Sequence, residues 1–336
     1  MNRALTVSFF LSFSFVAACS APDVKIPKLS DEAVKAERQH QLEQSITYQR
    51  SQTIRLAETA HPLLKLAPIA CENKTRYRLG VLLHSLEQYS DHQKPAAKSL
   101  YQFDNAVQVN HVLTQGPADG HLQHGDKLVA INGSLLSGAH TTQLKIIKDA
   151  LRSGTPVKLQ FWRHEEQQQT TITPEQVCDY PVLLRNSDMV NAYADGSNII
   201  ITSGLMRYAE KDSELAMIIA HEMAHNSQQH IWKRLKNTAL GSLIDIALIT
   251  QGIVSPFINA GIGGNLYSQH YELEADIVAV RMLYKSGFSL EGIDQFWRKI
   301  AAIHPRSITH GKLVSHPTTV ERVLVIQKEI SQLTTP

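Results

Sequence analysis

The sequence has almost no net charge for its length: its 336 residues give a formal charge of +2. No stripe of lysine and arginine interleaved with aromatic residues stands out, so nothing in the composition indicates nucleic-acid binding. Charged residues make up 19% and hydrophobic residues 43%, which argues against a chain that is disordered throughout. The length favours two domains with accessory segments over one compact unit.

Apolar runs long enough to cross a membrane are also missing, because a spanning helix needs about 20 predominantly apolar residues. At the N-terminus the run Ala4–Phe15 is short, follows the positive charge of Arg3, and leads into Val16-Ala17-Ala18 and then Cys19. This order is typical of a signal peptide, and a cysteine directly after small residues resembles a bacterial lipobox. The resemblance implies that Cys19 is lipidated; the alternative is an ordinary signal peptide with an incidental cysteine. Ser20, in place of aspartate, implies the outer membrane by the enterobacterial sorting convention.

A second apolar stretch, Thr238–Leu266, is interrupted by Asp245, Gln251, Pro256 and several glycines. Polar groups are costly inside a bilayer, so these interruptions argue against a spanning helix. We expect an apolar helical hairpin here, which acts either as a lid or as a surface that touches lipid.

Cysteines are scarce, with three in the chain. Lipidation of Cys19 leaves Cys71 and Cys178, and an even remainder in an oxidising compartment favours a disulfide. The sequence does not show whether their Cα atoms approach within bridging distance. Two separate buried thiols therefore stay as the alternative.

The segment Ser30–His61 is polar, with apolar residues at loose helical intervals and Pro62 after it. Ser30 and Asp31 are N-cap candidates, and the proline is expected to end the helix. This helix either packs on the later domains or forms a solvated stalk.

The next segment, residues 71–175, contains short β-type runs and one helical pattern. The expected strands are Val107–Val112, Asp126–Ile131 and Val157–Trp162, and the expected helix is Thr141–Leu151. Their order resembles a PDZ domain, as do the matching sequences Leu79-Gly80-Val81, Gly116-Pro117-Ala118, Gly125-Asp126-Lys127-Leu128 and Ile131-Asn132-Gly133. PDZ domains add an extended peptide to a sheet edge. The resemblance implies that Leu79, Gly80 and Val81 present backbone N–H groups to a peptide carboxylate; the alternative is a degenerate domain packed against its neighbour.

The strongest chemical signal is His221-Glu222-Met223-Ala224-His225, on a helix expected to begin at Glu214 after a cap at Asp212 or Ser213. Histidines four residues apart project from one helix face, so both can bind a single zinc ion. The intervening Glu222 is rotated away from that position but can reach a metal-bound water as a general base. The alternative is a surface helix with two incidental histidines.

Catalytic zinc generally takes three protein ligands, and Glu272 is the best candidate for the third. It lies in a helical pattern that runs from about Tyr267 to Lys285. Asp276 shares the face of Glu272 and is placed to accept the second N–H of a ligating histidine, whereas Glu274 points elsewhere. A simple salt-bridge role for Asp276 is the alternative.

Taken with Glu272-x-x-Ala275-Asp276, the histidine motif resembles the gluzincin family that contains HtpX, BepA and the CAAX prenyl endopeptidases. Asn191-Ala192-Tyr193 resembles a family segment that leads into a hairpin, whose edge would hold substrate as an added strand. His316-Pro317, with Arg322 further on, resembles another family element. The resemblance implies that His316 either stabilises an oxyanion or reversibly plugs the open metal position; the alternative is a histidine at a helix start.

The expected fold class is α+β, with a PDZ-like β-sandwich or barrel followed by a mostly helical gluzincin peptidase domain and a small β-hairpin or sheet over its active-site helix. The expected boundaries are 1–18 for the signal peptide, 19–70 for the lipidated cysteine, tether and helix, 71–175 for the PDZ-like domain and 180–330 for the peptidase domain. We expect a periplasmic protein anchored by lipid in the outer membrane. Its expected function is zinc-dependent hydrolysis of peptide bonds in misfolded or envelope proteins, including outer-membrane proteins, with one zinc ion per chain. The alternative is an envelope quality-control or assembly adaptor with latent or occasional proteolysis.

Overall fold

The computed structural model describes residues 27–66, 70–71, 74–230, 269–303, 305, 308 and 320–335. The predicted signal peptide with Cys19, the apolar stretch Thr238–Leu266 and His316 lie outside these residues. Within the described part of the chain, no helix is long and apolar enough to cross a membrane.

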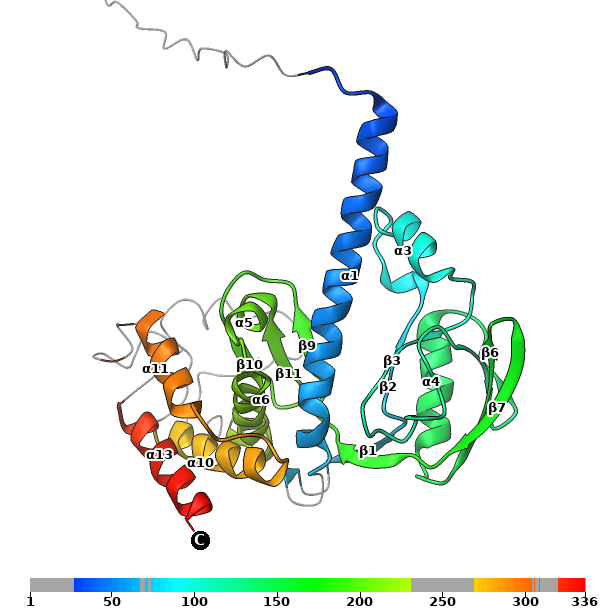
Figure 1. The fold of residues 1–336 in the computed structure, drawn as a ribbon. Helices are drawn as coiled ribbons and strands as arrows, with labels where there is room; N and C mark the ends of the chain where they lie inside the picture. The colour runs from blue at the N-terminus through cyan, green and yellow to red at the C-terminus, as the bar shows by residue number, and fades with distance from the viewer. Residues whose placement is uncertain are drawn as a thin grey trace, which may run out of the picture.

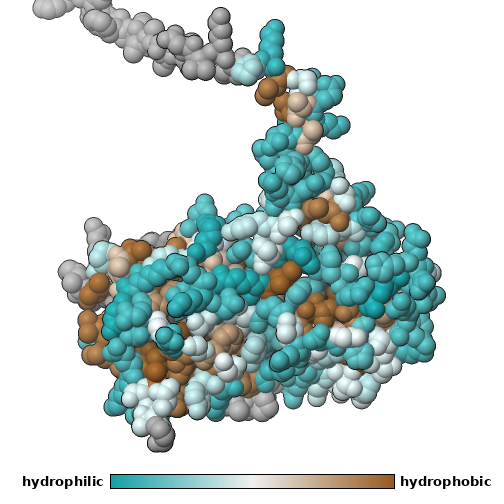
Figure 2. Space-filling view, in the orientation of Figure 1, coloured by the Kyte–Doolittle hydropathy of each residue, from teal (hydrophilic) through white to brown (hydrophobic). Residues whose placement is uncertain are grey.

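The first element is the long helix α1 (Asp31–Leu64), which begins where the Ser30 side chain accepts a hydrogen bond of 3.2 Å from the backbone N–H of Ala33. Pro62 lies inside α1 and does not end it, so the predicted end was too early. Figure 1 shows the N-terminal half of α1 projecting from the body, while its C-terminal half runs between a strand-rich part and a helical part. The projecting half is mostly hydrophilic (Figure 2). One helix therefore combines both expected roles, as an exposed stalk and as a packed element.

The strand-rich part is built on a sheet with the order β2-β3-β4-β6-β7, in which β5 also pairs with β4. Alternate residues of β6, namely Val157, Leu159 and Phe161, are buried, as the two-residue period of a strand requires. Helix α4 contributes Ile147 and Leu151 to the same core. The elements are β2 (Val81–His84), η1 (Leu86–Gln88), α3 (Lys94–Tyr101), β3 (Gln108–Val112), β4 (Lys127–Ile131), β5 (Ser134–Leu135), α4 (His140–Leu151), β6 (Val157–Arg163) and β7 (Glu166–Ile172).

The two ends of the strand-rich part meet in a separate antiparallel ribbon of β1 (Thr75–Arg78) and β8 (Glu175–Cys178). Beside this ribbon Cys71 and Cys178 form a disulfide, with their Cα atoms 5.7 Å apart. The structure therefore has the predicted disulfide and not the alternative of two separate buried thiols. Strand β1 pairs with β8 and not with the larger sheet, and the described strands form open sheets.

The helical part begins with a small sheet in the order β10-β11-β9. Its strands are β9 (Val182–Arg185), β10 (Ala192–Ala194) and β11 (Ile199–Thr202). Strand β11 lies in the middle and all four of its residues are buried. The antiparallel pair of β10 and β11 confirms the predicted hairpin and leaves β10 at an edge of this sheet.

Five described helices complete this part: α5 (Ser203–Tyr208), α6 (Asp212–Ser227), α10 (Gln269–Lys285), α11 (Ile293–Ile303) and α13 (Val320–Thr334). Helix α6 begins at Asp212, earlier than predicted, because the Glu214 carboxylate accepts hydrogen bonds from the N–H groups of Glu210 (2.8 Å) and Lys211 (3.2 Å). Nearly the whole of α6 is buried, with α10 packed along it and α13 packed along α10. Apolar surface lies on the side of α11 and α13 (Figure 2).

Helix α1 contacts both parts through half-buried and exposed polar side chains. Arg50 donates hydrogen bonds to the side chain and the carbonyl of Asn110 on β3, each 2.6 Å long. One turn later, Arg55 donates to the Met206 carbonyl (2.9 Å) and to the Asp212 carboxylate (2.8 Å) at the start of α6. The α1 helix thus fixes the strand-rich part against the helix that carries the histidine motif.

Candidate metal centre

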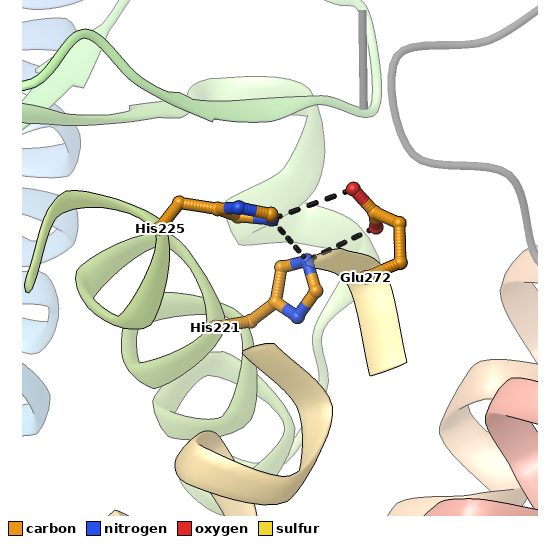
Figure 3. Close-up of side chains that lie close together, drawn as sticks. All are labelled: His221, His225 and Glu272. Atoms are coloured by element: carbon orange, nitrogen blue, oxygen red, sulfur yellow. Dashed lines mark hydrogen bonds and ion pairs between the residues drawn. The ribbon is translucent and has the colours of Figure 1, made fainter. Parts of the chain in front are cut away.

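Helices α6 and α10 bring three potential metal ligands to one point, and Figure 3 shows their side chains facing one another. His221 and His225 lie one turn apart on α6, with their Nε2 atoms 3.1 Å from each other. From α10, Glu272 places Oε2 3.4 Å from Nε2 of His221 and Oε1 3.5 Å from Nε2 of His225. All three residues are at most 1% exposed. The structure therefore brings together the three residues that the sequence predicted as a set.

The donor set and its spacing fit zinc. Two ligands held at the usual 2.0–2.1 Å from one zinc ion at the tetrahedral angle lie about 3.4 Å apart. The three separations in the structure, from 3.1 to 3.5 Å, agree with that value. Two imidazoles and a carboxylate that converge in a buried space are also the ligand types that zinc takes. Among the described residues, this is the group of His, Cys, Asp and Glu whose ligand atoms come within 4.8 Å of one another.

His221 is held from behind by a carboxylate. Its Nδ1 lies 3.0 Å from Oδ1 of Asp276, which is fully buried one turn after Glu272 on α10. Burial and the Arg322 charge lower the pKa of His221, yet hydrogen bonds to the two carboxylates outweigh them and raise it to about 9. The hydrogen bond to Asp276 leaves Nε2 of His221 directed at the metal position.

Arg322, from α13, ties the two carboxylates of α10 together. Its guanidinium donates two hydrogen bonds of 2.7 Å to Asp276 and lies 3.0 Å from Oε2 of Glu272. The same group sits 4.1 Å above the Trp297 ring, a cation–π distance. Burial lowers the pKa of Arg322, but the neighbouring carboxylates outweigh this and raise it, so the side chain stays charged. The sequence included Arg322 only as part of a family element and predicted no contact for it.

His225 is held from behind by a different kind of group. Its Nδ1 lies 2.9 Å from Nδ1 of His230, whose Nε2 lies 3.1 Å from Oε2 of Glu274. Sequence reasoning missed His230 altogether, although a third histidine shortly after the motif was a visible signal. Glu274 does point away from the metal position, as predicted, and its carboxylate meets His230 instead.

The proposed base and the hairpin with the proposed substrate edge both connect to α6. Glu222 is buried next to His221 on α6, and its charge helps to raise the pKa of Arg322. On the hairpin, the turn after β10 is fastened to α6 by Asn226, which accepts a hydrogen bond from Gly196 N–H (2.7 Å) and donates one to the Asn198 carbonyl (3.0 Å). The hairpin is thereby fastened to the helix that carries the two histidines.

A family model matches residues 158–330, just over half of the chain, and it is that of peptidase family M48. The chain belongs to peptidase family M48. M48 peptidases are zinc-dependent in general, in agreement with the donor set of the cluster. Residues 69–170 match the PDZ domain model, which confirms the predicted PDZ-like fold before the M48 part.

Curated M48 relatives match part of the chain. It is 33% identical over 136 residues to the "Beta-barrel assembly-enhancing protease" of Yersinia pestis, covering 35% of this chain and 27% of that protein. The protein of the same name from Escherichia coli (strain K12) is 26% identical over 171 residues, covering 45% and 34%. The "Metalloprotease LoiP" of Escherichia coli (strain K12) is 29% identical over 152 residues, covering 42% and 59%. The match therefore spans about a quarter to a third of the length of the first two relatives.

The loop predicted to receive a peptide carboxylate lies at the start of β2, the strand at one edge of the larger sheet. The carbonyls of Leu79 and Gly80 accept hydrogen bonds from Ala118 (2.9 Å) and Leu113 (2.8 Å). Gly80 has a φ of 71°, and a Cβ added to it would lie 2.9 Å from the Pro117 ring. The close approach of the Gly80 backbone to Pro117 therefore requires glycine.

Proposed function

We propose that this chain is a zinc-dependent endopeptidase in which His221, His225 and Glu272 hold one zinc ion. The observation that carries the proposal is the buried convergence of three ligand atoms from α6 and α10 within 4.8 Å. Each histidine also has its second ring nitrogen hydrogen-bonded, an arrangement typical of metal ligands. Membership of the M48 family favours hydrolysis over the adaptor alternative.

In the proposed mechanism, the chain orients a water molecule and an extended peptide. When bound, zinc supplies the Lewis acidity that makes a peptide carbonyl and water reactive at neutral pH. The Glu222 carboxylate accepts a proton from the attacking water and passes it to the amine nitrogen as the peptide bond breaks. Asp276 and Arg322 keep His221 and Glu272 in place throughout.

The substrate proposal has two parts. The scissile segment adds as a strand to the β10 edge at Asn191, Ala192 and Tyr193, on the hairpin that Asn226 fastens to the metal-binding helix α6. A second segment, carrying a free carboxylate, binds at residues 79–81 of the PDZ-like part. Two sites on one chain favour a long, extended or unfolded protein over a short peptide.

The envelope location is part of the same proposal. The lipobox-like sequence at Cys19 supports a lipid anchor, and the relatives whose names refer to β-barrel assembly support outer-membrane proteins as substrates. His316 stays a prediction as an oxyanion stabiliser or plug.

The experiment compares wild-type protein with Glu222→Gln in two measurements: zinc content by elemental analysis and cleavage of an unfolded test protein. The variant should retain zinc, because Glu222 is not among the three converging ligands. It should cleave about 10²- to 10⁴-fold more slowly, the usual effect of removing a general base. Cleavage by the variant at the wild-type rate would show that Glu222 is not the base.

A further inference from the structure

We propose that His230 is a positioning residue that holds His225 in the orientation and tautomer required for metal binding, and that Glu274 fixes His230 in turn. This inference rests on the proposed function only in taking His225 as a metal ligand. It assigns a role to two residues outside the His-Glu-x-x-His motif and the Glu272 ligand.

Three contacts define the position of the His230 ring, which is fully buried. Its Nδ1 lies 2.9 Å from Nδ1 of His225, and its Nε2 lies 3.1 Å from Oε2 of Glu274. The ring also stacks on Tyr271, with centroids 4.6 Å apart and planes 25° from parallel. An imidazole held at both nitrogens and on its face has little freedom to rotate.

The hydrogen bonds permit one arrangement of protons once His225 binds a metal through Nε2. A ligating imidazole needs its lone pair on that nitrogen, so its proton must sit on Nδ1. This N–H donates to Nδ1 of His230, which is an acceptor only in the neutral ring with its proton on Nε2. The Nε2–H of His230 then donates to the Glu274 carboxylate. The Glu274 carboxylate therefore selects the metal-binding tautomer of His225 through two consecutive hydrogen bonds, with His230 between them.

The two histidine ligands are thus supported differently. His221 donates directly to a carboxylate, Asp276, whereas His225 reaches its carboxylate through a neutral imidazole. A neutral acceptor places less negative charge behind the ligand than a carboxylate does. We therefore expect the contact with His230 to contribute mainly through orientation.

The backbone after α6 is bent to bring His230 beneath His225. The helix ends at Ser227, and Gln229 adopts a left-handed conformation with a φ of 55°. A non-glycine residue adopts this conformation at a cost in free energy, so tertiary contacts must hold it there. The turn is closed by the hydrogen bond from Gln229 N–H to the Asn226 carbonyl, 3.1 Å long.

The test uses a matched pair of variants, His230→Asn and His230→Leu. The two side chains have nearly the same size, but only asparagine offers an oxygen close to the former Nδ1 that can accept from His225. The measurements are the zinc dissociation constant, by competition with a fluorescent chelator, and the visible spectrum of the Co²⁺-substituted protein. His230→Leu should weaken zinc binding about 10- to 100-fold, the usual effect of removing such a partner, and should alter the Co²⁺ bands. His230→Asn should restore most of the affinity.

A second pair of variants, at Glu274, keeps the test valid if the variants of the buried His230 fail to fold. Glu274 is partly exposed, so Glu274→Leu and Glu274→Gln should both fold, which circular dichroism of the metal-free proteins checks. Glu274→Leu should weaken zinc binding several-fold, whereas Glu274→Gln keeps an acceptor oxygen and should stay close to wild type.

The inference is overturned if His230→Leu binds zinc as tightly as wild type, if it loses no more affinity than His230→Asn, or if Glu274→Leu has no effect. A wild-type protein that binds no zinc would contradict the proposed function instead. The two failures are therefore distinguishable.

Discussion

Replacement of the buried Arg322 by methionine gives the most quantitative test of its contacts with Asp276 and Glu272. The guanidinium makes two hydrogen bonds of 2.7 Å to Asp276, lies 3.0 Å from Glu272 and stacks on Trp297. Methionine fills much of the volume but leaves two carboxylates close together in a buried site without the guanidinium that offsets part of their charge.

The magnitude follows from the burial of these groups. Removal of one partner from a buried ion pair costs about 3–5 kcal/mol, because the remaining charge stays desolvated. With a urea m-value of about 2 kcal/mol/M, a loss of about 4 kcal/mol lowers the unfolding midpoint by about 2 M. A matched control joins the same two helices closer to the surface: Arg281 on α10 is half-exposed and lies 2.6 Å from the buried Glu329 on α13. Arg281→Met should cost less than Arg322→Met, because the Arg281 guanidinium is half-exposed and a single carboxylate loses its partner.

The assay is urea unfolding of both variants and the wild type in the presence of a chelator, followed by far-ultraviolet circular dichroism. The chelator keeps all three proteins free of metal, so that differences in metal binding do not contribute to the differences in the free energy of unfolding. If the midpoint of Arg322→Met falls by no more than that of Arg281→Met, the buried network does not stabilise the helix pair and the reasoning is refuted.

Two further predictions concern the third ligand and a buried histidine of the strand-rich part. Glu272→Gln should lower bound zinc in elemental analysis while Glu274→Gln retains it, and the reverse result would move the ligand to Glu274. Burial, with nearby positive groups, lowers the pKa of His84 from 6.5 to about 3, in a cluster with Tyr101 (4.8 Å) and Phe103 (4.7 Å). Between pH 3 and 6.5 the unfolded chain therefore binds a proton at His84 more readily than the folded chain does, so the free energy of unfolding should fall by about 2 kcal/mol from pH 7 to pH 5. Urea unfolding of His84→Phe at the two pH values should show a smaller loss. An equal loss would contradict the assignment.

Helical periodicity was sufficient to predict which candidate ligands share a helix face. The four-residue spacing of His221 and His225, and the rotation that separates Glu272 from Glu274, are local properties of single helices. The contact of His221 with Asp276 followed from the same geometry, because Asp276 shares the face of Glu272.

The remaining features of the site depend on contacts between distant segments. His230 reaches His225 only because Gln229 takes a left-handed backbone conformation. A glutamine in the sequence does not predict that conformation, which glycine favours. Arg322 meets Asp276 only because α13 packs on α10. The role of α1 could be predicted only as two alternatives, because the partners of its polar residues, such as Arg50, and of its buried apolar residues, such as Leu56 and Leu63, lie in distant segments.

The measurement that tests the central claim most directly is a zinc titration of the metal-free protein, with cleavage of an unfolded, fluorescently labelled protein as the readout. Cleavage should be absent without metal, rise in proportion to added zinc and level off at one zinc ion per chain. Cleavage that persists in the metal-free protein, or that does not respond to zinc at all, would contradict a zinc peptidase centred on His221, His225 and Glu272.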